Sequence, residues 1–390
     1  MSASNAASTA QIVLQRLATA VQNCSAELVS GAILGEIDDL ATKLFALSDN
    51  AKEQPDGKDS TDHAQGLGDA VLLTTNPGLE LEVRREVVDV CGECNAIVPS
   101  PFGCPGFVLV SGASMDSLLT LRSVHEILNY EGHFTVPAKE EGAGDSKNGA
   151  KEGQKEGGEL PEELVYIREQ MKGFDLKGMK DAASFRVTSS CSGAQSFKSN
   201  ECEREVGSVV HEKYKMKADM KNFDVAVRVD VCMRHVLVST SPNRSLLSKR
   251  HKLAFTRTVT LKPNVAFCMI QMCEPKKQGF SLLDPFCGGG TVLLEAAEMF
   301  GDKAGKLFGC DRSDAAVKGS QANAKAAGND KIEFQQMNAQ AVDRKFAPDT
   351  FDAVVTNPPW GIRLSSDADL TKIYRGFLYA VSKVVKKGGR

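Results

Sequence analysis

Apolar residues near the N-terminus recur at about helical spacing between residues 9 and 47. This spacing predicts one or two amphipathic helices, whose apolar side chains are Ile12, Leu14, Leu17, Val21, Leu28, Ile33, Ile37, Leu40 and Leu44. We therefore expect an N-terminal helical extension over residues 1–48 and a polar linker over 49–68. The first 26 residues are rich in Ser and Ala, as in organelle transit peptides, but a single Arg makes that interpretation the weaker one.

Strand and helix patterns then alternate as far as residue 135. Apolar runs over 70–77 and 106–112 predict two strands, and one-sided apolar spacing over 78–90 and 114–130 predicts two helices. Residues 136–159 consist mainly of Gly, Lys and Glu, which cannot bury enough apolar surface to fold. We expect them to form a disordered surface insert.

A second set of alternating patterns covers residues 160–243. It predicts helices at 161–172 and 200–216, and strands at 184–190, 224–232 and 235–240. The residues that follow, 244–263, are basic and irregular, and we expect them to form a linker.

The remaining residues, 264–390, alternate strand and helix most regularly. The predicted strands are 280–284, 306–311, 331–337 and 351–357, and the predicted helices are 291–300, 314–327 and 369–386. This order is typical of a parallel, doubly wound α/β sheet with right-handed crossovers. Residues 386–389 look like a helix end that turns into a further strand. We therefore expect the chain to be a fragment whose sheet is truncated at its C-terminus.

Composition narrows the class of protein. A chain of 390 residues predicts two or three domains, and it has no apolar run long enough to span a membrane. Eleven cysteines without regular spacing favour a reducing compartment, so we expect the cytoplasm, with an organelle or the nucleus as alternatives. Residues 184–263 hold 15 Lys and Arg against 7 Asp and Glu, a balance of +8 within a net charge of −3. Such a basic middle favours an anionic partner.

A Gly-rich turn joins the first strand and first helix of the last unit. It has the sequence Asp284-Pro285-Phe286-Cys287-Gly288-Gly289-Gly290-Thr291, and Asp311 ends the next strand. In doubly wound sheets this is the position of the ligand crevice, and the second acid is placed to bind a ribose. The alternative is a turn that only closes the unit. Cys287 is better explained as a small loop residue than as a nucleophile.

The residues around this turn favour one nucleotide ligand over others. There is no G-K-[ST] for a P-loop, and the G-x-G-x-x-G of dinucleotide binders is absent. A carboxylate at Asp284 would repel a pyrophosphate, but it suits a ligand that carries ammonium and sulfonium charge. S-adenosylmethionine therefore fits better than NAD.

The sequence Asn357-Pro358-Pro359-Trp360 follows the strand predicted at 351–357. Two prolines fix the backbone and lack N–H donors, which leaves carbonyls and the Asn side chain to accept hydrogen bonds from a planar exocyclic amine. Holding both amine hydrogens would aim the nitrogen lone pair at a methyl donor. Trp360, the only tryptophan, could stack on the base. A simple turn is the alternative for Asn-Pro-Pro alone.

With these motifs in place, the chain resembles the THUMP-domain RNA (guanine-N2) methyltransferases of the tRNA type. The segments DPFCGGGT and NPPWGIR are similar to the first and fourth motifs of that family. The resemblance extends over residues 70–390 through NPGLELEVRREV (76–87), SFRVTSSCSGAQSF (184–197), EREVG (203–207), LSKR (247–250) and TLKPNVAFCM (260–269).

The resemblance implies a fold, a reaction and a set of site residues. It implies a ferredoxin-like domain over 69–135, a THUMP RNA-binding domain over 160–243 and a Rossmann-like S-adenosylmethionine-dependent methyltransferase domain over 264–390. The substrate would be a guanine N2 in tRNA near the acceptor stem, and a small zinc-containing activator subunit would be a plausible partner. The cofactor-binding residues would be Asp284, Pro285, Phe286, Cys287, Gly288, Gly290, Thr291, Asp311, Arg312, Asn338, Ala339 and Asn357, and the catalytic ones Asn357, Pro358, Pro359 and Trp360. Asn338 departs from the family, which usually has an aspartate at that position.

Two further groups of residues allow opposing interpretations. The basic side chains Arg244, Lys249, Arg250, Lys252 and Arg257 are predicted to contact RNA phosphates, and a solvated face is the alternative. Cys91, Cys94 and Cys104 suggest a zinc site, but no fourth ligand follows at suitable spacing. We expect reduced thiols there and no metal. Glu295, on the helix after the Gly-rich turn, is predicted to be structural.

Three functions therefore remain after the sequence analysis. The first is methylation of a guanine in tRNA, with an rRNA guanine as the alternative substrate. The second is methylation of DNA adenine or protein glutamine, which would leave the basic N-terminal half unexplained. The third is RNA binding without catalysis.

Overall fold

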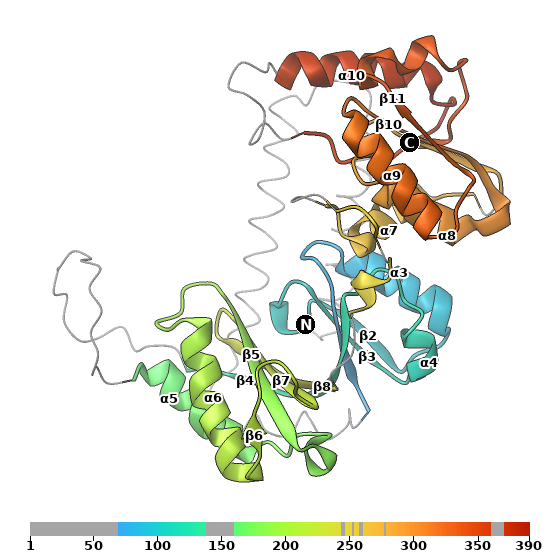
Figure 1. The fold of residues 1–390 in the computed structure, drawn as a ribbon. Coiled ribbons are helices and arrows are strands. Elements are labelled where there is room, and N and C mark those ends of the chain that lie inside the picture. Colours follow the sequence, from blue (N-terminus) through green and yellow to red (C-terminus); the bar gives the residue numbers. More distant parts are fainter. Residues whose placement is uncertain are drawn as a thin grey trace, which may run out of the picture. The chain divides into compact units, whose positions relative to one another are not determined.

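The structure is a computed structural model that describes residues 69–137, 160–242, 246–251, 253–256, 260–276, 278–359 and 370–390. These residues form an eight-stranded sheet and a four-stranded sheet with helices packed on them (Figure 1). The predicted N-terminal extension and nearly all of the predicted linker and insert lie outside the described residues. Within the described part, no helix is both long and apolar enough to cross a membrane.

The first half of the eight-stranded sheet has the βαββαβ order of a ferredoxin-like unit. Its strands lie in the order β2-β3-β1-β4 and pair antiparallel throughout. The elements are β1 (Val71–Thr74), α3 (Glu80–Cys91), β2 (Ala96–Pro99), β3 (Phe107–Ser111), α4 (Met115–Leu118) and β4 (Glu126–Thr135). The ferredoxin-like fold implied by the resemblance is confirmed.

The helix predicted over 114–130 is wrong in extent and partly in type. Only α4 is helical, and from Glu126 the chain is extended as β4. The apolar spacing behind this prediction comes from Leu118, Leu121, Val124 and Leu128. All four are buried, but they line the core from a short helix, a turn and a strand, which explains the error. β4 is hydrogen-bonded to β1 on one edge and to β8 on the other, and this long-range pairing overrides the local pattern.

The second half of the same sheet continues from β4 in the order β8-β7-β5-β6. Its elements are α5 (Glu162–Gly173), β5 (Ser184–Ser192), α6 (Ser199–Tyr214), β6 (Lys217–Ala218), β7 (Val225–Cys232) and β8 (His235–Pro242). Helices α5 and α6 bury Leu164, Ile167, Val206 and Val209 against the strands. The two α/β segments read separately from the sequence therefore share one sheet.

The four-stranded sheet is parallel throughout, with the order β11-β10-β9-β12. This confirms the parallel α/β prediction. Its elements are α7 (Pro263–Gln271), β9 (Phe280–Asp284), α8 (Thr291–Phe300), β10 (Ala304–Asp311), α9 (Asp314–Ala326), β11 (Ile332–Gln336), β12 (Ala353–Val354) and α10 (Leu370–Val384). One apolar cluster places α7, α8 and α9 on one face, and another places α10 on the opposite face (Figure 1).

Short 3-10 helices complete the described structure. They are η1 (Pro101–Gly103), η2 (Met179–Asp181), η3 (Leu247–Lys249), η4 (Gly301–Lys303) and η5 (Ala339–Arg344). β12 is shorter than the strand predicted over 351–357, although Val355 N still donates to Leu283 O at 3.0 Å. On its other side, Val354 N donates to Arg390 O at 2.9 Å and Arg390 N donates to Asp352 O at 3.1 Å.

Candidate functional site

The Gly-rich turn after β9 has a backbone that depends on its glycines. Gly288 and Gly290 have φ of 52° and 82°, which disfavour any residue with a Cβ. A Cβ on Gly290 would also lie 3.0 Å from the Phe334 ring and 3.1 Å from Ser320 Cβ, whereas a Cβ on Gly288 would meet nothing within 4 Å. Gly290 is therefore required for packing, and Gly288 leaves open space where a ligand can approach the backbone.

Asp284 lies buried at the end of β9. Its Oδ1 accepts hydrogen bonds from Thr356 Oγ1 at 2.6 Å and from Phe286 N at 3.2 Å. Burial raises the pKa of Asp284 to about 7, and the nearby charge of Asp311 adds to the increase. Thr356 is the residue directly before Asn357. Its hydroxyl therefore connects the start of the Asn-Pro-Pro segment to the carboxylate at the start of the Gly-rich turn.

Asp311 ends β10 and supports the turn from the neighbouring strand. Its Oδ2 accepts from Gly288 N at 3.1 Å, and its Oδ1 accepts from Ser313 N at 2.8 Å. Each carboxylate oxygen has a second lone pair that can accept from a hydroxyl of a ligand. Arg312, the next residue, is exposed, and its carbonyl accepts from Gln336 Nε2 at 3.1 Å.

Asn338 and Ala339 follow β11 at the same edge of the sheet. Asn338 is exposed, and its Oδ1 caps η5 by accepting from Gln340 N at 3.0 Å. Ala339, the first residue of η5, is buried. Asp284 and Asp311 end their strands, and Asn338 and Asn357 follow theirs. Because the carboxyl ends of parallel strands share one edge, all four residues lie at that edge.

The Asn-Pro-Pro segment is half-buried as it leaves β12. Tyr374 of α10 donates its hydroxyl to Pro359 O at 3.1 Å, which fixes the second proline against the helix. Pro358 and Asn357 are also half-buried. Trp360 lies outside the described residues, so its predicted stacking stays a prediction.

Four residues of the turn have mainly packing roles in the structure. Burial raises the pKa of the Cys287 thiol, and the carboxylates of Asp284 and Asp311 raise it further, so the thiol stays protonated. This agrees with Cys287 as a small loop residue. The ring of Phe286 meets that of Phe377 edge-on at 5.2 Å. Pro285 and Thr291 are buried at the two ends of the turn.

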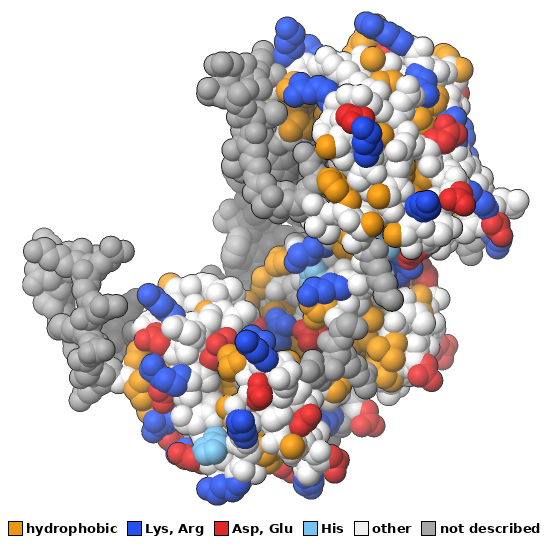
Figure 2. Space-filling model, viewed as in Figure 1, with side chains coloured by type: hydrophobic (Ala, Val, Ile, Leu, Met, Phe, Trp, Pro, Cys, Tyr) orange, Lys and Arg blue, Asp and Glu red, His pale blue; other side chains and the backbone are white. Residues whose placement is uncertain are grey.

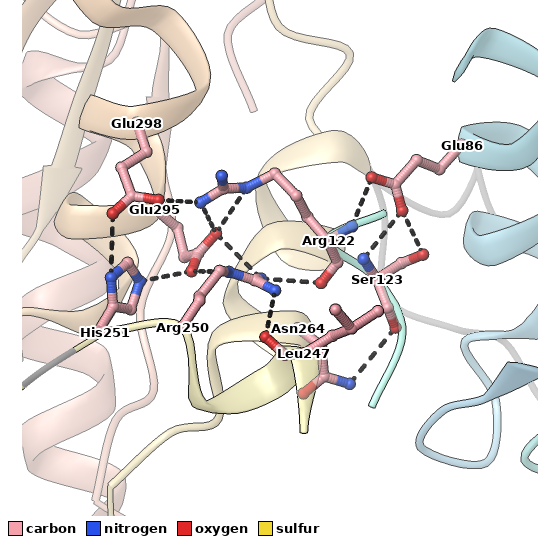
Figure 3. Close-up of polar contacts among 9 residues, drawn as sticks. All are labelled: Glu86, Arg122, Ser123, Leu247, Arg250, His251, Asn264, Glu295 and Glu298. Atoms are coloured by element: carbon pink, nitrogen blue, oxygen red, sulfur yellow. Dashed lines mark hydrogen bonds and ion pairs between the residues drawn. The ribbon is translucent and has the colours of Figure 1, made fainter. Parts of the chain in front are cut away.

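Arg250, one of the residues predicted to contact RNA, lies in a buried ion cluster around Glu295. Glu295 on α8 is fully buried and accepts from Arg250 Nε at 2.9 Å, from Arg122 Nη2 at 2.7 Å and from His251 Nε2 at 2.6 Å (Figure 3). Glu298, one turn further on, pairs with Arg122 at 2.6 Å and with His251 at 3.1 Å. Glu295 thus forms the structural contacts that were expected of it.

Pairing inside this cluster shifts the pKa values of its members. Burial alone would raise the pKa of Glu295, but hydrogen bonds from His251 and Arg250 lower it below its usual value. For His251, burial would lower the pKa, but the two glutamates raise it to about 9. His251 is therefore charged at neutral pH, and the cluster holds three cations on two carboxylates.

The cluster continues into the ferredoxin-like unit. Arg250 Nη2 donates to Arg122 O at 2.8 Å, while Arg122 N and Ser123 N donate to Glu86 at 2.7 and 2.9 Å (Figure 3). Glu86 lies on α3 and is buried. Hydrogen bonds therefore connect α3, through residues 122–123 and Arg250, to the helix that follows the Gly-rich turn.

The other basic residues predicted to contact RNA are placed differently. Lys249, at the end of η3, is exposed, and Arg244, Lys252 and Arg257 lie outside the described residues. On the face drawn in Figure 2, Lys and Arg side chains alternate with Asp and Glu rather than forming one extended basic patch. A local site is therefore better supported on this face than a broad basic surface.

Sequence analysis did not identify several residues that organise the site. Thr356 was not distinguished within its strand, and Arg122 and His251 were not linked to Glu295. A signal for the second group was available, because a glutamate within the apolar sequence TVLLEAAEMF must be paired if that helix face is buried.

The cysteines that suggested a zinc site lie at 91, 94 and 104. Burial raises the pKa of the Cys91 thiol. Within the described ranges, no three His, Cys, Asp or Glu side chains gather as a metal site.

Two known domain families match this chain, and each match falls on a different one of its two sheets. Residues 166–241 match the THUMP domain family, and residues 250–390 match the family described as RMKL-like, methyltransferase domain. The first match falls within the second half of the eight-stranded sheet, and the second contains the Gly-rich turn and the Asn-Pro-Pro segment.

Two curated relatives of similar sequence carry the names of guanine-N2 methyltransferases. A tRNA (guanine(6)-N2)-methyltransferase of Thermus thermophilus is 32% identical over 54% of this chain and 62% of the relative. The human U6 snRNA (guanine-N(2))-methyltransferase THUMPD2 is 29% identical over 53% of this chain and 39% of the relative. The chain thus covers less than two thirds of either relative.

Two solved structures have similar folds over most of this chain. The crystal structure of TrmN from Thermus thermophilus matches with a TM-score of 0.60 and 25% identity, over 81% of this chain and 85% of TrmN. SMU.472, a putative methyltransferase complexed with SAH, matches with a TM-score of 0.57 and 17% identity, over 80% and 86% of the two chains.

Proposed function

We propose that this chain, which carries a THUMP domain followed by an RMKL-like methyltransferase domain, methylates the N2 amine of a guanine in tRNA with S-adenosylmethionine. One observation carries the proposal: the hydrogen bond from Thr356 to Asp284 joins the Gly-rich turn to the residue before Asn357. A cofactor site and an amine-binding site at one sheet edge are what methyl transfer to an exocyclic amine requires. The acceptor stem, which the resemblance implies, is the proposed region of the tRNA.

The residues at this edge fit the chemistry of S-adenosylmethionine. Gly288 leaves space beside its backbone, Asp311 can accept from ribose hydroxyls, and Asp284 supplies a carboxylate for the ammonium group. Asn338 Oδ1, which already caps η5, has a second lone pair for the adenine amine. When bound there, the cofactor supplies a methyl group on a positively charged sulfur.

Asn357 has the central chemical role in this proposal. The side-chain oxygen accepts hydrogens of the guanine N2 amine, and nearby carbonyls of the two prolines are further acceptors. This holds the nitrogen lone pair toward the methyl donor, and the proton released after transfer goes to solvent. The tie between Tyr374 and Pro359 O keeps the segment in place during the reaction.

We expect Asp311→Ala to weaken cofactor binding by about 1–3 kcal/mol, the scale for a lost hydrogen bond to a charged acceptor. The substitution removes the proposed ribose acceptor, and it also frees Gly288 N, which the carboxylate holds at 3.1 Å. Calorimetric titration with S-adenosylmethionine measures the effect. Asp314→Ala, on the exposed first turn of α9, is the matched control. Unchanged affinity in a folded Asp311→Ala protein would contradict the ribose role.

Cofactor affinity is also expected to depend on pH through Asp284. Its pKa of about 7 means that the ionised fraction rises as pH increases through that value. A ligand ammonium prefers the ionised carboxylate, so the affinity for S-adenosylhomocysteine should rise on the order of tenfold between about pH 5.5 and about pH 7.5. Asp284→Asn should bind more weakly and lose this dependence. A wild type whose affinity is flat over that range would exclude the ammonium contact.

The proposed reaction is tested by offering separate acceptors with labelled cofactor. Transfer to tRNA, with N2-methylguanosine recovered after nuclease digestion, would support the proposal. Transfer only to U6 snRNA or rRNA would keep the reaction and change the substrate. Binding of tRNA without transfer would support the non-catalytic alternative, and transfer to DNA or protein alone would refute the RNA assignment.

The partner implied by the resemblance is a small zinc-containing activator subunit. We propose it as a partner for activity rather than for folding. The same assay, run with and without purified activator, tests this directly. Equal transfer rates in the two reactions would remove the activator from the proposal.

A further inference from the structure

A hollow of about 450 Å³ lies away from the Gly-rich turn, against the ferredoxin-like unit. Its lining comes from the ends of β1 and β4, the residues before β3, Arg228 of β7, and the stretch after β8 that includes Lys249 and Lys262. A volume of this size accommodates a ligand as large as a nucleotide. Of its lining residues, Lys249 was predicted above to contact an RNA phosphate, and the hollow as a site has been given no role.

Two lysines give the hollow its charge. Lys249 and Lys262 are both exposed, and in the part of the chain that the structure describes neither forms an ion pair. Lys262 Nζ lies 3.5 Å from His125 Nε2, but this ring nitrogen is 2.7 Å from Asn76 Oδ1. Because the Asn oxygen is an acceptor, the ring donates to it and offers no acceptor to the lysine.

The acidic residue of the hollow, Glu126, is already paired. Glu126 accepts from Arg228 Nη1 at 3.2 Å and from Ser241 Oγ at 3.2 Å. Arg228 also pairs with Asp230, at 2.7 Å, so one guanidinium serves two carboxylates and these three side chains together carry a charge of −1. The two positive charges of Lys249 and Lys262 outweigh it, so the side chains around the hollow are net positive, which suits an anion.

Another part of the lining is apolar. It consists of Pro77, Pro105, Phe107 and Leu246. A ligand with an anionic end and a flat, partly apolar body fits this division of charge. A nucleotide unit has both features, with the phosphate at one end and the sugar and base at the other.

We propose that this hollow binds one nucleotide of the RNA substrate, with its phosphate at Lys249 and Lys262 and its base against the apolar residues of the lining. The inference rests on the proposed function, because it assigns the occupant to the RNA being methylated. RNA is favoured over a free nucleotide because Arg228 belongs to the strand β7 inside the matched THUMP region, so the hollow continues from that domain. The contact positions the RNA rather than reading its sequence.

The test measures binding of unfractionated tRNA to the full chain as a function of salt concentration. Lys262→Glu and Lys249→Glu should each lower tRNA affinity about tenfold and reduce the slope of log affinity against log salt by about one. Lys325→Glu is the matched control: it makes the same charge change on the exposed face of α9 and should stay within about twofold of wild type. Circular dichroism and S-adenosylmethionine affinity should remain unchanged in all three variants.

Binding of AMP distinguishes the two sources of a phosphate. If Lys262→Glu abolishes AMP binding and leaves tRNA affinity unchanged, the hollow is a small-molecule site and the RNA assignment is wrong. If both lysine variants bind tRNA as Lys325→Glu does, the inference is overturned. These readouts involve no methyl transfer, so they test the hollow separately from the reaction. If the wild-type chain methylates tRNA but the lysine variants bind tRNA normally, the inference is refuted and the proposed function stands.

Discussion

Asn357→Ala is expected to lower kcat about 10²–10³-fold, the scale for removing one preorganised hydrogen-bonding group from an active site. The reason is that Asn357 accepts from the amine most strongly as the nitrogen lone pair turns toward the methyl donor, so its contribution belongs to the transition state. Single-turnover rates with tRNA, measured at saturating cofactor, report this step directly.

Two comparisons separate the chemical role of Asn357 from a structural one. Cofactor affinity should change little in Asn357→Ala, because Thr356 and Asp284 still connect the two segments. Asn357→Asp keeps an acceptor oxygen of the same size and should recover part of the rate. If Asn357→Ala transfers methyl groups at the wild-type rate, the chemical basis of the assignment is lost.

The parallel sheet was predictable because its signal is local. Each strand of that unit is a short apolar run, and each helix has one-sided apolar spacing, so the order βαβαβ could be read from the sequence. β9, α8, β10 and α9 each begin and end within two residues of their predicted limits. The cofactor turn followed from the same reading, since its glycines lie at a strand-to-helix junction.

Pairing between distant segments could not be predicted in this way. The helix expected over 114–130 fails because β4 gains hydrogen bonds from β1 and from β8, which begins at residue 235. Apolar positions three or four apart were read as one helix face, yet here they come from a helix, a turn and a strand. Spacing alone does not contain the partner strand that decides between these structures.

The same limit applies to the site. The types of residue in the turn and in Asn-Pro-Pro were predictable from chemistry, but the hydrogen bond between Thr356 and Asp284 depends on β9 and β12 being neighbours. Glu295 was expected to be structural, whereas its partners Arg122 and His251 lie 173 and 44 positions away in the chain. Long-range side-chain contacts of this kind are visible only in three dimensions.

The buried position of Glu295 makes it the residue whose loss should cost most stability. We expect Glu295→Ala to lower the free energy of unfolding by about 3–5 kcal/mol, because removing one partner of a buried ion pair leaves the other charges uncompensated. Arg122, Arg250 and His251 would all lose their shared acceptor. Urea denaturation followed by circular dichroism measures the change. Glu295→Gln should show most of the same loss of stability, because it removes the same negative charge.

Glu298→Ala provides the matched control on the same helix, since its side chain is 32% exposed and its loss should cost about 1 kcal/mol or less. The pH dependence supplies a second readout. The pKa of His251 is raised to about 9 by the two glutamates, so its contribution is complete below an unfolded-state pKa of about 6.5 and is lost as pH rises through about 9. Wild-type stability should fall over that window, and Glu295→Ala should show a smaller fall. A Glu295→Ala protein within 1 kcal/mol of wild type would mean that the contacts in Figure 3 do not hold α8 against residues 122–123.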